Sequence, residues 1–154
     1  MSTESVIDEI GRAIATLKFP PSAMRLLAPM EGEAVYYSAL NHFVLSGDRR
    51  WWWEAFRRTA AYAKPAGGDA WRRVARIAPD PCEIVWFIAE DDQLPHYPVF
   101  ETTPEVASAV IGECYGFEYY LIAKSFDWLV CEDHHGGLHA IGEQVEERLL
   151  EGVA

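Results

Sequence analysis

The stretch "FEYYLIAKSFDWLVCEDHHGGLHAIG" (117–142) contains three apolar runs, at 117–123, 127–132 and 138–142. Each run has the length and the β-branched or aromatic content of a strand. The turns "KSFD" and "DHHGG" between them are short enough to join antiparallel neighbours. The stretch therefore predicts three consecutive strands of an antiparallel sheet.

Two further strands are predicted upstream, "EIVWFIAE" (83–90) and "YPVFE" (97–101). A helix over 102–114, with a threonine cap and a proline in its first turn, separates them from the three runs. A last amphipathic helix covers 143–150. The order β-β-α-β-β-β-α predicts a five-stranded, mainly antiparallel sheet with one face covered by helices.

The first half of the chain shows helical periodicity instead. Apolar residues three or four apart, together with prolines, predict five helices, at about 5–17, 21–27, 31–47, 49–63 and 70–78. Ser5, Asp48 and Asp69 are the expected N-caps of the first, fourth and fifth of them. The fold class is accordingly α+β. The 154 residues fit one domain, 1–154, with a helical half of about 1–78 and a sheet half of about 79–154.

The net charge of −11 is distributed unevenly. Basic residues concentrate in 49–76, whereas carboxylates dominate 79–154. An acidic surface of this kind repels nucleic acid and anionic membranes and suits a basic protein partner. No apolar run approaches the length of a membrane span, and the N-terminus lacks the pattern of a secretory signal, so we expect a cytoplasmic protein.

The densest polar cluster is "CEDHHGGLH" (131–139). Thiolate, imidazole and carboxylate groups are ligands of zinc and similar metals, which makes His135, His139 and Cys131 candidate ligands. No H-E-x-x-H or C-x-x-C motif accompanies them. Three interpretations stay open: the polar tip of a hairpin, a metal site, and a binding or acid–base site.

Placed on a hairpin, the cluster follows a two-residue alternation. Asp133 and His135 then share one face with Cys131, and Glu132 and His134 share the other, although a Gly-Gly turn can disturb this phase. An acid–base role needs a carboxylate beside an imidazole. Asp133, Glu132, Glu118 and Glu113 are available, but their spacing pairs none of them with a histidine.

Two other segments could form surfaces. In "RRWWWEAFRR" (49–58), three consecutive tryptophans on a helix cannot form one stacking platform, so Trp52, Phe56 and Trp53 are expected to face the core. The acidic loop residues Glu90, Asp91 and Asp92 form either a solvated face or a docking surface for a basic protein.

The segments "VWFIAED", "PVFETT", "IGECYGFEYYLIAKSFDWLVCEDHH" and "IGEQVEERL" together resemble a family of small uncharacterised bacterial proteins, over about 49–150. That family has a Trp-rich helix, a Glu-Tyr-Tyr strand and a Trp-Leu-x-Cys-Glu strand with paired histidines. The opening "IDEIGRAIATLKFPPSAMRLL" is similar to the start of the SUKH immunity superfamily. The second resemblance implies an α+β protein that binds toxins through an acidic surface.

We therefore expect a non-enzymatic protein-binding module without a cofactor, a candidate immunity protein whose partner is a basic toxin. The alternative is a metal-dependent or acid–base enzyme built on the histidine cluster, and self-association through the aromatic surface also stays open. The candidate binding residues are His134, His135, His139, Asp133, Glu132, Glu90, Asp91 and Asp92.

Overall fold

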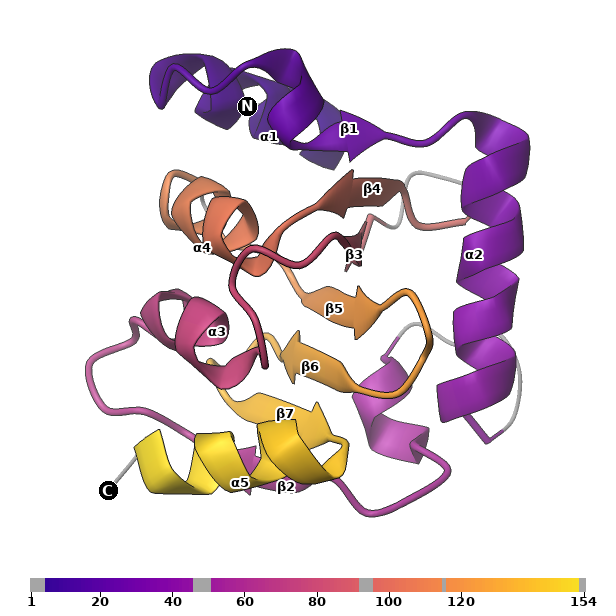
Figure 1. Ribbon diagram of the computed structural model, residues 1–154, viewed down its shortest axis with the longest axis vertical. Coiled ribbons are helices and arrows are strands. Elements are labelled where there is room, and N and C mark those ends of the chain that lie inside the picture. The colour runs from indigo at the N-terminus through magenta and orange to yellow at the C-terminus, as the bar shows by residue number, and fades with distance from the viewer. Residues whose placement is uncertain (1–4, 46–50, 92–95, 115, 153–154) are drawn as a thin grey trace.

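The computed structural model describes residues 5–45, 51–91, 96–114 and 116–152. Within these ranges the chain forms five α-helices and one antiparallel sheet of seven strands (Figure 1). No helix in the described ranges is both long enough and apolar enough to cross a membrane. From one edge to the other, the strands are β1 (Arg25–Leu26), β4 (Val99–Thr102), β3 (Val85–Ala89), β5 (Tyr119–Ala123), β6 (Leu129–Glu132), β7 (Leu138–Ile141) and β2 (Ala61–Ala63).

The three consecutive strands predicted from 117–142 are confirmed as β5, β6 and β7, which pair in chain order. Tyr120 lies opposite Cys131, and Cys131 lies opposite His139. The two upstream strands are confirmed as β3 and β4. Since β3 pairs with β5 as well as with β4, the central part of the sheet is continuous.

The predicted count of five strands is too low, because the structure adds a short strand at each edge. In the segment predicted as the helix 21–27, a single 3₁₀ turn (Pro21–Ala23) leads into β1. Arg25 of β1 lies opposite Glu101 of β4, and their side chains form an ion pair at 3.2 Å. Pairing with an open sheet edge thus outweighs the local helical pattern.

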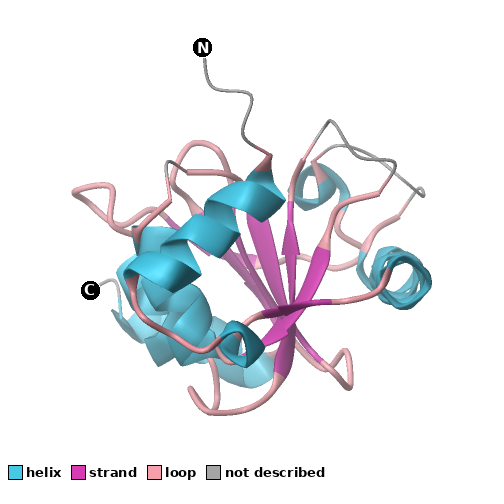
Figure 2. Ribbon diagram, turned by 90° about the horizontal axis from the view of Figure 1, so that it is seen from above, coloured by secondary structure: helices cyan, strands magenta, loops and turns pink. Residues whose placement is uncertain are grey.

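Helices cover both faces of the sheet, so the expectation of one covered face is wrong (Figure 2). On one face lie α1 (Val6–Thr16), α3 (Trp71–Ile77), α4 (Pro104–Gly112) and α5 (Glu143–Gly152); on the other lies α2 (Pro29–Phe43). The side chains of β5 alternate between two separate cores: Tyr119 and Leu121 face the four helices, while Tyr120 and Ile122 face α2. An uninterrupted apolar strand is typical of burial on both faces.

The segment 51–63, predicted as part of a helix, instead forms a 3₁₀-helix (Trp52–Ala55) followed by β2. Trp52 is fully buried, and its ring stacks on Tyr120 with a centroid distance of 4.4 Å. The Tyr120 hydroxyl also accepts a hydrogen bond from the Trp52 backbone N–H at 3.1 Å. The 3₁₀-helix and β2 replace the predicted regular helix because they allow Trp52 to pack beside α2 and cover the second face of the sheet.

Two of the predicted helix caps are confirmed, and a third, Asp48, lies outside the described residues. The Ser5 hydroxyl accepts from the Asp8 N–H, and the Thr103 hydroxyl accepts from the Val106 N–H. Asp69, expected to cap the helix over 70–78, is not its N-cap residue: Ala70 holds that position without a side-chain hydrogen bond. Asp69 instead forms an ion pair with Arg72 at 3.8 Å.

We expect the substitution Trp52→Ala to lower the free energy of unfolding by about 3–5 kcal/mol, because it opens a large cavity between α2 and the sheet. Trp51→Ala is the matched control: Trp51 is only half-buried, and its loss should cost roughly 1 kcal/mol. Chemical denaturation followed by circular dichroism measures both. Equal losses for the two variants would contradict the assignment of Trp52 as the core residue of the triplet.

Candidate functional site

The turn between β6 and β7 contains an extra residue that changes the facing of the histidines. Asp133 N–H donates to the Gly137 carbonyl at 2.9 Å, and Gly136 N–H donates to the Asp133 carbonyl at 3.0 Å. Gly136 has φ +82°, the left-handed conformation that glycine adopts without strain. This is the geometry of a three-residue hairpin loop with a bulge, in which strict alternation stops at Asp133.

Asp133 holds this turn together from inside. Its side chain is 5 % exposed. Oδ1 accepts the backbone N–H groups of His135 (2.8 Å) and Gly137 (3.0 Å), and Oδ2 is 2.8 Å from Nε2 of His139. Burial alone would raise the pKa of Asp133, but the hydrogen bonds from His139 and from the two backbone groups outweigh burial and lower that pKa.

Glu118, directly before β5, is the second buried carboxylate of the site and is 1 % exposed. Its Oε1 lies 2.9 Å from the His134 backbone N, 2.6 Å from His134 Nδ1 and 3.0 Å from Trp53 Nε1. Its Oε2 is buried and has no hydrogen-bond partner among the described residues. One oxygen thus ties β5, the β6–β7 turn and the tryptophan segment together.

The three imidazoles gather on one side of the sheet, around Trp53. The ring centroids of His134 and His135 are 4.0 Å apart, and those of Trp53 and His139 are 5.6 Å apart. Trp51 approaches His134 to 5.0 Å. The expectation that His134 and His135 face opposite sides is therefore wrong, and the bulged turn is the reason.

Chemically, the arrangement contains two carboxylate–imidazole pairs, Glu118–His134 and Asp133–His139. The His134 side chain is 41 % exposed and the His139 side chain 12 %. Because Glu118 engages Nδ1 of His134, the Nε2 atom of this exposed ring is the group available to a ligand. A buried carboxylate that fixes an imidazole in this way can orient it for hydrogen bonding or for proton transfer.

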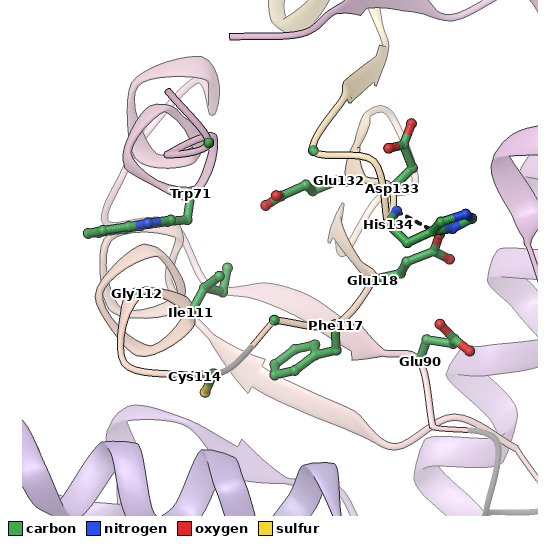
Figure 3. Close-up of a pocket in the computed structure, with 13 residues that line it drawn as sticks. Trp71, Glu90, Ile111, Gly112, Cys114, Phe117, Glu118, Glu132, Asp133 and His134 are labelled. Carbon is green, nitrogen blue, oxygen red and sulfur yellow. Dashed lines mark hydrogen bonds and ion pairs between the residues drawn. The ribbon is translucent and has the colours of Figure 1, made fainter. Parts of the chain in front are cut away.

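A cavity of about 650 Å³ extends around the same strand ends (Figure 3). In Figure 3 the Glu132 side chain points toward Trp71, whereas Glu118, His134 and Glu90 lie on the other side of the strand ends. The described lining residues include no lysine or arginine: they are Gly68, Trp71, Glu90, Ile111, Gly112, Cys114, Gly116, Phe117, Glu118, Glu132, Asp133, His134 and Gly136.

Glu132 faces the four-helix side of the sheet. Its Oε1 accepts a hydrogen bond from the Tyr119 hydroxyl at 2.7 Å. Burial raises the pKa of Glu132 above the ordinary range of a glutamate; the Tyr119 hydrogen bond offsets only part of this effect, and the neighbouring charge of Asp133 adds to it. A cation bound beside Glu132 would therefore stabilise the ionised form of its carboxylate.

The other predicted residues are not all part of this site. Glu90 lines the cavity, but Asp91 is buried and accepts the Val6 N–H at 3.3 Å, near the start of α1. Asp92 lies outside the described residues. Cys131 lies opposite His139 but is fully buried, and burial raises the pKa of its thiol well above the ordinary value. Since metal ligation needs the thiolate, Cys131 is a poor ligand.

Among the residues that the structure describes, no three His, Cys, Asp or Glu side chains are placed to hold a metal ion. The metal interpretation of His135, His139 and Cys131 thus has no geometric support in that part of the chain.

Sequence reasoning missed the participation of Trp51, Trp53, Trp71 and Tyr119. Nothing in their spacing links them to the histidines, because the contacts join segments far apart in the chain. The sequence offers Glu118 as an available carboxylate but does not pair it with a histidine. One local signal favours Glu118 as a site residue: a lone carboxylate at the start of the fully apolar strand "YYLIA" (119–123) must find a partner at the sheet's end.

The chain belongs to the family of unknown function DUF6756, whose model matches residues 2–152. This agrees with the resemblance to an uncharacterised family, whereas nothing found here links the chain to the SUKH superfamily. No curated protein and no solved structure matches the chain significantly.

We expect Asp133→Ala to lower the free energy of unfolding by about 2–4 kcal/mol, because two backbone N–H groups and His139 lose their acceptor. Asp127→Ala, an exposed aspartate in the β5–β6 turn, should change stability by less than about 0.5 kcal/mol. Thermal and chemical denaturation measure both. A similar loss in both variants would show that Asp133 has no special role.

The stability contributed by Asp133 should also depend on pH. A lowered pKa means that the ionised form stabilises the fold, so the contribution is complete above the ordinary value of 3.8 and disappears as the pH falls through the folded-state pKa. The stability difference between the wild type and Asp133→Asn should therefore shrink on acidification below 3.8. A difference that stays constant over that range would contradict the role of the charge.

Proposed function

We propose that the protein is a non-enzymatic binding module that recognises a basic protein at the strand ends, and that its partner is a toxin which it neutralises in the bacterial cytoplasm. One observation carries the proposal: the cavity has four carboxylates, those of Glu90, Glu118, Glu132 and Asp133, and no lysine or arginine among its described lining residues. A cavity of this composition attracts cations and rejects anions.

The overall charge supports the same class of partner. With a net charge of −11, the chain generates a negative field that speeds the encounter with a basic protein. Immunity to a toxin demands fast and tight association, for which such steering is suited. Small size and an acidic surface suit this role.

The arrangement of the site also favours binding. Hydrogen bonds fix Asp133 and Glu118 before any ligand arrives, so these side chains lose little conformational entropy on association. Beside them, Trp51 and Trp53 are only partly buried. Tryptophan is enriched among the residues that contribute most to the affinity of protein interfaces. The strand ends thus combine charge, rigidity and aromatic surface.

The proposal is tested by capture from the native host with tagged full-length protein. We expect a stoichiometric basic protein whose capture weakens as salt rises. In the double variant Glu90→Gln/Glu132→Gln, affinity for it should fall on the order of 30-fold or more, since charged pairs at a buried site are lost. The control Glu113→Gln/Glu147→Gln removes the same charge outside the cavity lining. Co-expression should rescue cells from the captured protein if it is a toxin.

Capture of no basic protein under several conditions, or capture that is equally strong with both double variants, would contradict the proposal. The second outcome would show that net charge rather than the cavity determines binding.

An acid–base enzyme is the second candidate, favoured by the Glu118–His134 pair, in which a buried carboxylate holds an exposed imidazole at 2.6 Å. In that case ester or amide compounds with a cationic group should be turned over, and His134→Gln should lower the rate by about 10²–10⁴-fold, the usual contribution of a general base. Absence of turnover across such a set, at several pH values, would leave only the binding function.

A further inference from the structure

We propose that the cavity at the strand ends binds the guanidinium group of an arginine side chain. The inference rests on the proposed function, because it names the chemical group by which a basic partner would be held. It depends on the positions of the carboxylate acceptors, on the composition of the cavity wall and on one buried oxygen that lacks a donor.

The first observation is the unsatisfied oxygen of Glu118. This residue lines the cavity and is 1 % exposed, and its Oε2 accepts no hydrogen bond from the described residues. Its other oxygen accepts three. A buried carboxylate oxygen without a donor is costly, so native proteins rarely retain one unless water, an ion or a ligand supplies the missing hydrogen. A cationic donor at this position would satisfy it.

The second observation is Glu132, which projects into the cavity toward Trp71 (Figure 3). Only its Oε1 accepts a hydrogen bond from a described residue, the Tyr119 hydroxyl. Its carboxylate lies on the opposite side of the strand ends from that of Glu118. Both residues belong to the lining of the same cavity.

The geometry of these acceptors favours a guanidinium over an ammonium group. A guanidinium carries five N–H donors in a fixed plane, so it can donate two parallel hydrogen bonds to one carboxylate and still have donors left for other acceptors. An ammonium group is compact and strongly hydrated, and it loses more hydration in a partly buried cavity. Trp71, Ile111 and Phe117 supply an apolar wall, which strengthens the attraction between the bound cation and the carboxylates.

The close packing around Trp71 keeps this wall in place. A Cβ atom added to Gly112 would lie 2.7 Å from the Trp71 ring, so the ring packs directly on the backbone of α4. The guanidinium carbon of Arg72 lies 4.9 Å from the centroid of the same ring. Contacts with both α3 and α4 therefore hold the Trp71 side chain in place, and the cavity is formed before a ligand enters.

Three amino-acid probes, whose amino and carboxyl groups are blocked and therefore uncharged, test the inference on the full chain. They are N-acetyl-L-argininamide, N-acetyl-L-lysinamide and N-acetyl-L-citrullinamide. They differ in the terminal group, which is guanidinium, ammonium or an uncharged urea of nearly the same shape. Titration calorimetry should show saturable binding of the arginine probe, at least about tenfold weaker binding of the lysine probe, and none of the citrulline probe. Binding should also weaken as the pH falls and Glu132 becomes protonated.

The substitution Glu132→Gln should weaken binding of the arginine probe by at least about tenfold. Glu113→Gln, an exposed glutamate near the end of α4 that does not line the cavity, should leave it unchanged. Circular dichroism checks that both variants are folded. Two-dimensional NMR of the wild type gives a measurement independent of any variant: amide shifts on adding the arginine probe should concentrate at Phe117, Glu118 and Glu132.

Absence of saturable arginine binding, equal affinity for arginine and lysine, or shifts located away from the cavity would each overturn the inference. These failures are distinguishable from failure of the proposed function. A captured basic protein that depends on Glu132, without selectivity for the arginine probe, would keep the function and remove the guanidinium assignment. Selective binding of the arginine probe without any captured partner would keep the guanidinium assignment and remove the proposed function.

Discussion

The structure depends on a single carboxylate oxygen, Oε1 of Glu118, which accepts hydrogen bonds from three groups in two other segments. Two of the groups belong to His134 in the β6–β7 turn, and one belongs to Trp53 in the segment that covers the second sheet face. Hydrogen bonds to an ionised acceptor are stronger than neutral ones, especially where water is excluded. This constraint sets the position of the turn, the tryptophans and the imidazoles relative to one another.

The central sheet could be predicted from the sequence because local pattern and tertiary requirement agree there. Strands β3 to β7 are apolar runs bounded by turns, and the confirmed helices α1 and α4 carry the expected serine and threonine caps. The edges of the sheet could not be predicted. Arg25–Leu26 and Ala61–Ala63 are too short to show a period, and they become strands only because a neighbouring strand offers free backbone groups.

For the candidate site, the sequence identified the cluster but not its geometry. His134, His135, His139 and Asp133 are close in the chain, so their proximity in space follows directly. Their facing depended on one extra residue in the turn, where Gly136 takes a positive φ, and the two-residue rule fails at such a bulge. The pairing of Glu118 with His134 and Trp53 joins residues 16 and 65 positions apart, and spacing within one sequence carries no information about such contacts.

The sheet ends at both sides in very short strands, two residues in β1 and three in β2. Long open edges invite a strand from another molecule, which leads to strand-exchanged oligomers or fibrils. Here each edge presents few backbone groups, and one edge strand, β1, carries Arg25, which forms an ion pair with Glu101 of the neighbouring strand. Short edges of this kind disfavour edge-to-edge pairing between molecules. Association by strand addition is thereby disfavoured, and recognition is left to side chains at the ends of the strands.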